Sequence, residues 1–284
     1  MIQPARACII TPVLSIESLQ NRRAALIIAH PGHELRVYRW LGLVRPRVFV
    51  FTDGSGHSGQ SRLNRTTSIL HKLGGQPGSI YGRLSDAEIY SAILNRDAAL
   101  FCKMADELAG ELVSHKVQYV VGDAFEGYNP AHDVCRLVIN AAIRIASLTV
   151  PGIENFEVLL VNKASDHTLP GSADMIRIEL EEDMLAQKLG DLRAYSELAV
   201  DADRILEDEG VDTLRTECLR RVVNESNDEF NGFKEPPFYE TYGEARVAAG
   251  YYKQVIRYRD HVTPIAEALR QSTDLRGQAV NCKS

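Results

Sequence analysis

The chain has 284 residues, of which 45% are hydrophobic and 25% charged, and its formal net charge is −6. This is the composition of an ordinary globular protein, and it excludes disordered, collagen-like and disulfide-dense chains. The acidic balance and the lack of a long basic run argue against nucleic acid as a partner, so a small molecule is expected. No stretch approaches the roughly 20 apolar residues that a membrane-spanning helix needs, and no membrane partner is expected.

The cysteines and the N-terminus both favour a cytoplasmic location. An apolar patch at residues 1–14 is interrupted by Pro4, Arg6 and Pro12, so no secretory leader is expected. An odd number of scattered cysteines without a CxxC pair indicates reduced thiols. These cysteines are Cys8, Cys102, Cys135, Cys218 and Cys282.

Strands and helices are predicted to alternate along the first half of the chain. Ser85 and Glu88 form a capping box at the start of one helical stretch. The predicted strands are 24–29, 47–52, 117–121 and 157–161, and the predicted helices are 34–43, 60–74, 85–115 and 133–147. This alternation predicts an α/β fold with a mostly parallel sheet and helices on both faces.

The pattern changes towards the C-terminus, where charged amphipathic stretches predict helices at 175–206, 212–223 and 251–269. We therefore divide the chain into an α/β core at 1–170 and a mainly helical region at 171–284 that packs on it. Between these helices, 236–246 reads as an aromatic, acidic loop that begins with two prolines. It is expected either to close over the sheet edge and hold substrate hydroxyls or to pack the helices onto the sheet.

The most informative stretch is residues 25–34, an unbroken apolar run that ends in His30-Pro31-Gly32-His33-Glu34. Such a run is typical of a strand buried on both faces. Proline disfavours a helical conformation at His30, and glycine permits a tight backbone path. Both imidazoles are therefore expected at the carboxyl end of a buried strand, where open α/β sheets bind their ligands.

Histidines follow two further predicted strands, His57 in a glycine-rich loop and His132 at the start of a helix. Because the carboxyl ends of parallel strands share one edge of the sheet, His30, His33 and His132 are expected to converge there. Three protein ligands with an open fourth position form the catalytic type of zinc site. Zinc is the expected divalent metal, and iron, cobalt and nickel are also compatible with imidazole ligands. The loop at 54–59 lacks the dinucleotide-binding pattern, so no nucleotide cofactor is expected.

These motifs resemble the LmbE-like, or PIG-L, N-acetylglucosaminyl deacetylases. That family has Ala-His-Pro-Asp-Asp after its first strand and His-Pro-Asp-His at the start of a later helix. In this chain the corresponding segments are 29–33 and 129–132, and Thr52, Gly54 and Arg62 match further family positions. The resemblance covers about residues 24–165 and implies a Rossmann-like fold of the LmbE type. It also implies a zinc-dependent deacetylase with His30 and His132 as ligands.

The departures from the family pattern affect the chemistry. His33 stands where the family has an aspartate ligand, and Gly32 stands where it has the general base. In the second motif, Asn129 and Ala131 replace a histidine and an aspartate. The resemblance therefore implies a three-histidine site that needs another proton acceptor.

Several side chains in the converging loops are candidates for that catalytic role. Asp133 and Glu126 are favoured because they neighbour the third histidine, and Asp53 and Asp123 lie in the same loops. Glu34 is either a catalytic carboxylate or a group that orients an imidazole by accepting its free N–H. Tyr128 and His57 are candidates for stabilising a developing oxyanion.

Two functions follow as hypotheses. The first is a metal-dependent hydrolase of a C–N amide bond, with an amino sugar or an amide conjugate as substrate. The alternative is a diverged LmbE-like protein that keeps the metal but binds a ligand or performs other metal chemistry. The absence of an aspartate at Gly32 favours the alternative, whereas the retained histidines are compatible with both.

Overall fold

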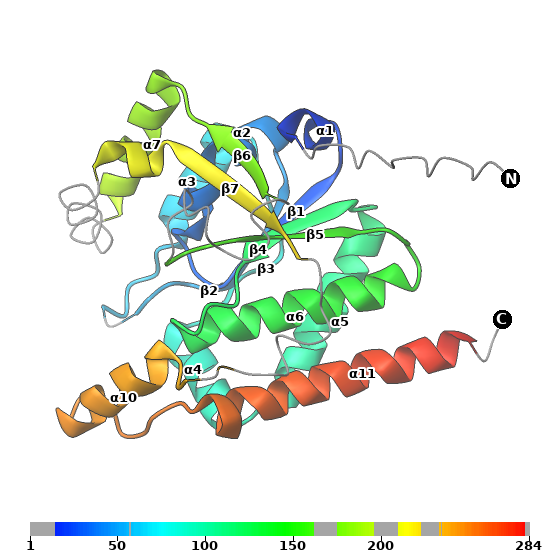
Figure 1. Ribbon diagram of the computed structural model, residues 1–284, viewed down its shortest axis with the longest axis vertical. Coiled ribbons are helices and arrows are strands. Elements are labelled where there is room, and N and C mark those ends of the chain that lie inside the picture. The colour runs from blue at the N-terminus through cyan, green and yellow to red at the C-terminus, as the bar shows by residue number, and fades with distance from the viewer. Residues whose placement is uncertain are drawn as a thin grey trace, which may run out of the picture.

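The computed structural model describes residues 15–56, 58–161, 175–195, 210–222, 233 and 235–281. Its centre is a seven-stranded sheet in the order β3-β2-β1-β4-β5-β7-β6 (Figure 1). The strands are β1 (Ala24–Ile28), β2 (Arg47–Thr52), β3 (Gln76–Leu84), β4 (Tyr119–Asp123), β5 (Glu154–Val158), β6 (Met175–Glu179) and β7 (Thr216–Arg221). Pairing is parallel from β3 to β5 and antiparallel where β7 joins β5 and β6.

Helices cover both faces of the sheet. The α-helices are α1 (Ile16–Gln20), α2 (Tyr38–Val44), α3 (Leu63–Leu73), α4 (Asp86–Leu94), α5 (Ala98–Ser114), α6 (Pro130–Ser147), α7 (Glu182–Ala194), α10 (Phe238–Ala248) and α11 (Thr263–Asn281). Shorter helical turns are η1 (His33–Val37), η3 (Val211–Leu214) and η4 (Tyr258–Val262). None of the described helices has the length and apolar character that a membrane span requires.

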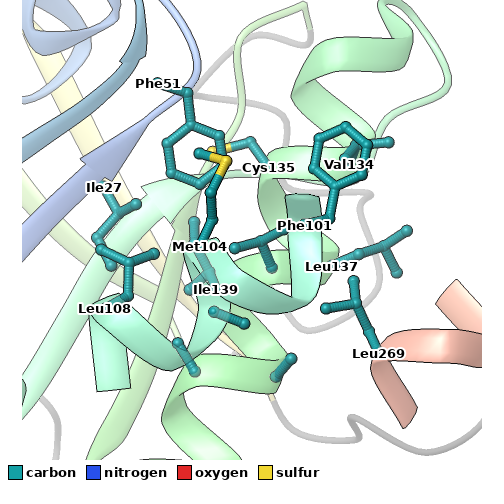
Figure 2. Packing of buried hydrophobic residues seen from close by; sticks show 14 of the residues in the cluster. Ile27, Phe51, Phe101, Met104, Leu108, Val134, Cys135, Leu137, Ile139 and Leu269 are labelled. Carbon is teal, nitrogen blue, oxygen red and sulfur yellow. The ribbon is translucent and has the colours of Figure 1, made fainter. Parts of the chain in front are cut away.

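Successive residues of β1 point to opposite faces, which explains its unbroken apolar sequence. Ala25 and Ile27 belong to the core beneath α4, α5, α6 and α11, whereas Leu26 and Ile28 belong to the core beneath α2 and α3. Figure 2 shows the first core, in which Ile27 and the side chains of α5 and α6 come together. Packing on both faces therefore fixes the position of β1 and of its carboxyl end.

The structure confirms the mostly parallel sheet with helices on both faces. Strands appear at the predicted places for β1 and β2, and Ser85 caps α4 with the expected reciprocal bonds to Glu88. The expected strands at 117–121 and 157–161 are displaced, because β4 ends at Asp123 and β5 begins at Glu154. Asp123 is therefore a buried strand residue and not a loop residue.

The sequence analysis did not predict β3, which lies next to β2 at one edge of the sheet formed by the described residues. This strand contains Pro77, Gly78 and Gly82, residues that are depleted in strands and tolerated at edges. Most of its side chains are at least partly exposed, so it also lacks an apolar pattern.

The helix predicted at 175–206 is confirmed over Glu182–Ala194 but wrong over Met175–Glu179, and the helix predicted at 212–223 is wrong over Thr216–Arg221. Residues 175–179 form β6 and residues 216–221 form β7, whereas α7 covers Glu182–Ala194 and the short turn η3 covers Val211–Leu214. In β6, Met-Ile-Arg-Ile-Glu alternates between more exposed and buried positions, which is the period of a strand. Parts of both predicted helices, 196–206 and 223, lie outside the described residues. The segment 171–284 thus supplies two strands as well as helices.

Two predictions near the C-terminus need correction. The stretch 236–246 is not a loop, because α10 begins at Phe238 directly after Pro237. The helix predicted at 251–269 starts later, with η4 at Tyr258 and then α11 as far as Asn281. Proline before the first turn is compatible with helix initiation, so the pair Pro236-Pro237 marks a helix start here.

Candidate functional site

The candidate site lies where the strand order of the sheet reverses. From β1 the chain proceeds to β2 and β3 on one side, whereas β4 and β5 continue on the other side. The loops after β1 and β4 diverge at this point, and such a crevice is the usual ligand site of an open α/β sheet. His30 and His33 follow β1, and His132 lies in the first turn of α6, which follows β4.

The structure brings these three imidazole rings together. The ring centroids are 5.4 Å apart for His30 and His33, 5.1 Å for His30 and His132, and 4.6 Å for His33 and His132. All three pairs are edge to face. The convergence that was predicted from two separate segments is therefore present in the fold.

The ring spacing fits a shared divalent ion. With metal–nitrogen distances of about 2.0–2.1 Å, imidazole centroids around one tetrahedral ion lie roughly 5 Å apart. As the side chains stand, no group of three or more His, Cys, Asp or Glu residues within the described ranges could hold an ion. The evidence for a shared ion is therefore the spacing of the rings and the hydrogen bonding of their nitrogens. The side chains are not arranged in a coordination geometry.

The hydrogen bonds of His30 leave one nitrogen available. Its Nδ1 lies 2.8 Å from Thr52 Oγ1 and 3.0 Å from Asp86 Oδ1. A carboxylate only accepts, so the proton belongs on Nδ1 and the lone pair on Nε2. Nε2 is buried and has no hydrogen-bond partner among the described residues. An unpaired, buried acceptor of this kind is what a metal ligand presents before the ion binds.

His33 is oriented in the same way by a second carboxylate. Its Nδ1 lies 2.8 Å from Asp123 Oδ2, and the same oxygen accepts the backbone N–H of Ala29 at 2.8 Å. Asp123 is buried at the end of β4, so it links the two strands that flank the crevice. Carboxylates on the far nitrogen of ligating histidines are the common supporting arrangement in metal sites.

His132 is placed by the start of α6. Asn129 caps the helix by accepting the N–H of Ala131 at 2.8 Å, and Pro130 occupies the first helical position. Asn129 therefore serves as the cap of the helix that carries His132.

Burial sets the charge state of the site. It lowers the pKa of His30, against the opposing effect of Asp86, and it lowers the pKa of His132 well below its ordinary value, with further lowering by His33 and His30. Burial raises the pKa of Asp86, but the hydrogen bond and charge of His30 outweigh it and hold that pKa well below its usual range. Neutral imidazoles beside ionised carboxylates are the protonation states that metal binding requires.

Glu34 does not orient an imidazole, contrary to one of our predictions. Its Oε2 accepts the N–H of Gly32 at 2.7 Å, and its Oε1 accepts the hydroxyl of Tyr195. Gly32 has a φ of 108°, a conformation that side chains other than glycine rarely adopt. Glu34 thus fixes the turn between the two histidines, and the imidazoles are held by Asp86 and Asp123 instead.

The other candidate side chains have contacts of their own. Asp133 Oδ1 accepts the N–H groups of Glu126 and Gly127, both at 3.1 Å, while its Oδ2 is buried without a partner in the described part of the chain. Burial raises the pKa of Asp133 to about 8. Glu126 accepts the N–H of Leu160 at 2.7 Å. Tyr128 is exposed, and His57 lies outside the described residues.

The sequence analysis missed Asp86 and the contact of Thr52. Asp86 opens α4 directly after β3, so it could be assigned to this edge of the sheet only once β3 was known. The capping box at Ser85 was the available signal, because it marks a helix start close to a strand end.

No family model matches the chain, and no curated protein matches it. Among solved structures, the chain is similar to the A40926 pseudoaglycone deacetylase Dbv21, with 17% identity, a TM-score of 0.49, and coverage of 73% of this chain and 99% of the other. It is also similar to a deacetylase of teicoplanin biosynthesis, with 17% identity, a TM-score of 0.48, and coverage of 72% and 99%. The functional argument therefore rests on the residues of the site.

Proposed function

We propose that this chain is a metal-dependent hydrolase of a C–N amide bond, with His30, His33 and His132 as the ligands of a divalent ion, zinc in the first instance. The observation that carries the proposal is the meeting of three imidazoles at the switch point of the sheet, two of them with a carboxylate on Nδ1. The motif order of the LmbE-like deacetylases supports the amide as the bond that is cleaved.

The residues of the chain perform the orienting work. Asp86 and Asp123 keep the Nδ1 protons in place, so that Nε2 of His30 and of His33 can donate lone pairs. When bound, a divalent ion supplies an acidified water and polarises a carbonyl oxygen. Burial of His30 and His132 excludes bulk water from the inner side of the cluster.

Proton transfer needs a group other than residue 32. We assign this role to Asp133, because its Oδ2 is buried without a partner in the described part of the chain and it follows His132 directly. In this scheme Oδ2 takes a proton from the attacking water and passes it to the leaving amine. The other candidates for this role are Glu126, Glu34 and Tyr128. The carboxylates of the two glutamates already accept backbone N–H groups of neighbouring loops.

A second candidate function is favoured by Gly32. A glycine with a φ of 108° stands where the related family has its general base, and its N–H is already bonded to Glu34. A diverged protein that keeps the ion without hydrolysing amides would show this combination.

Two measurements on the purified full-length chain separate the candidates. The first is metal content per chain, in the unaltered protein and in the variants His30→Ala and His132→Ala. The second is acetate release from N-acetylglucosamine and a panel of other N-acetyl compounds. We expect stoichiometric metal that both variants lose, together with acetate release that Asp133→Asn lowers by about 10²-fold or more. Full occupancy in either histidine variant would contradict the ligand assignment, and full occupancy without acetate from any amide would establish the second candidate.

A further inference from the structure

A strip of aromatic side chains lies on the surface beside the loop that leads to His132. The aromatic strip consists of Tyr128, Phe238, Tyr242, Tyr251 and Tyr252. Tyr128 and Phe238 stack with centroids 5.0 Å apart, Phe238 and Tyr242 with centroids 5.7 Å apart, and Tyr242 meets Tyr252 at 6.5 Å. Four of these residues are 44–68% exposed. A continuous exposed aromatic surface of this kind marks a binding site more often than a single exposed ring does.

Two contacts connect the aromatic strip with the histidine site. Tyr128 precedes His132 by four residues, and the N–H of Tyr239 in the first turn of α10 donates to Gly127 O at 3.4 Å. The side-chain amide of Asn129, the cap of α6, donates to the hydroxyl of Tyr90 at 2.9 Å.

Tyr90 is a partly buried partner of the helix cap next to the histidine site. Burial is the main cause that raises its pKa to about 12, against the opposing effect of the hydrogen bond from Asn129. Through Asn129, the Tyr90 hydroxyl is connected to the start of α6, the helix that carries His132. Figure 1 shows α10 at one end of the molecule.

Arg246 supplies a positive charge within the strip. Its guanidinium carbon lies 3.9 Å from the ring centroid of Tyr251, 5.6 Å from that of Tyr252 and 5.9 Å from that of Tyr242. Its Nε is buried and has no hydrogen-bond partner among the described residues.

The acidic neighbours of Arg246 are engaged elsewhere. Glu240 and Glu244, on the same helix, pair with Arg257 at 3.2 Å and 2.5 Å. No carboxylate of the described ranges pairs with Arg246. A guanidinium that is stacked on aromatic rings and lacks an acidic partner is suited to a carboxylate or phosphate from outside the chain.

We propose that the aromatic strip and Arg246 bind the substrate's scaffold, and that this scaffold carries a flat ring next to an acidic group. The ring stacks on the exposed tyrosines and Phe238, and the acidic group pairs with the Arg246 guanidinium. The inference rests on the proposed function for the amide that is cleaved, and it adds the substrate class. It predicts that a neutral amino sugar is a poorer ligand than an acidic, ring-bearing amide.

The test uses two probes that differ only in charge, N-acetyltryptophan and its neutral amide. Binding to the full-length purified chain is measured by titration calorimetry. We expect the unaltered chain to bind the acidic probe about tenfold more tightly or better, because one charge-assisted bond is added. Arg246→Gln removes this preference and Arg246→Lys retains part of it, while Tyr251→Ala weakens the binding of both probes.

Arg259→Gln is the matched control, since Arg259 is an exposed arginine outside the strip, and it keeps the preference. Equal binding of the two probes by the unaltered chain, or an undiminished preference in Arg246→Gln, would overturn the proposal. The binding assay does not depend on hydrolysis. If the chain prefers the acidic probe but releases no acetate from any amide, the binding role of the aromatic strip is supported and the proposed function fails. If the chain releases acetate but binds both probes equally, the proposed function is supported and the binding role of the strip fails.

Discussion

Asp86 and Asp123 each contact Nδ1 of a proposed ligand, His30 and His33 respectively, so they would act on an ion only through these histidines. We predict that Asp86→Asn and Asp123→Asn each lower the affinity for zinc about 10- to 100-fold, since an amide holds the Nδ1 proton less well than a carboxylate. Competition with a chromophoric chelator measures the affinity. Asp183→Asn, at an exposed position of α7, is the control and should bind zinc normally. Normal affinity in both site variants would contradict the orienting role.

Glu34 has a structural task at the same scale. Removing its carboxylate in Glu34→Ala leaves the buried N–H of Gly32 without its acceptor and breaks the bond to the hydroxyl of Tyr195, which keeps Thr66 Oγ1 as a partner at 2.9 Å. We expect the free energy of unfolding to fall by about 1–3 kcal/mol for each group left unpaired. Urea denaturation of the metal-free chain measures this loss. The losses of stability in Glu34→Ala and Tyr195→Phe should not be additive, because both variants remove the hydrogen bond between Tyr195 and Glu34. Full additivity would contradict this hydrogen bond.

At the scale of elements, Glu217 of β7 contacts both α2 and α7 and so connects these helices with the sheet. This buried carboxylate accepts the N–H groups of Arg39 and Trp40 in the first turn of α2, and it pairs with Lys188 of α7 at 3.1 Å. A carboxylate at a helix N-terminus satisfies amides that have no partner within the helix. Burial lowers the pKa of Lys188, and Glu217 opposes that shift.

Lys188→Met should therefore be strongly destabilising, because it leaves Glu217 buried without its cation. We expect a loss of about 3–5 kcal/mol in the free energy of unfolding. The double variant Lys188→Met with Glu217→Gln removes both charges and should recover part of the loss. Denaturant unfolding of the three proteins tests this, and a loss below about 1 kcal/mol in Lys188→Met would show that the pair is not buried as described.

The elements also show how far the sequence could be interpreted. An apolar run that fits a two-faced burial predicted β1 and β2, and reciprocal side-chain bonds predicted the start of α4. The edge strand β3 was not predicted because its exposed residues show no alternation of apolar and polar side chains. The strands β6 and β7 were not predicted because their alternation of charged and apolar residues extends over only five or six positions. Short strands with charged exposed faces resemble amphipathic helices in composition, and only pairing distinguishes them.

For the whole molecule, the histidine site joins segments that are about a hundred residues apart in the chain. An ion that binds the folded chain and not the unfolded chain stabilises the fold in proportion to the logarithm of its concentration over the dissociation constant. We predict that removing zinc with a chelator lowers the midpoint temperature of thermal unfolding. If zinc was present at 100 times its dissociation constant, the free energy of unfolding falls by about 2.7 kcal/mol. Differential scanning calorimetry measures the shift. In His30→Ala and His132→Ala the chelator should have no effect, and an equal shift in those variants would place the ion elsewhere.

The sequence by itself determined the parallel core, the place of the histidines at strand ends and their convergence at one edge. These follow because a strand buried on both faces must be apolar throughout and because parallel strands end together. Only the tertiary structure decided which carboxylates hold the imidazoles, since Asp86 reaches them from the start of α4 and Asp123 from the end of β4, and no sequence spacing encodes these contacts. The same reason applies to the aromatic strip, because Tyr128 and the rings of α10 become neighbours only when α10 packs against the loop before α6.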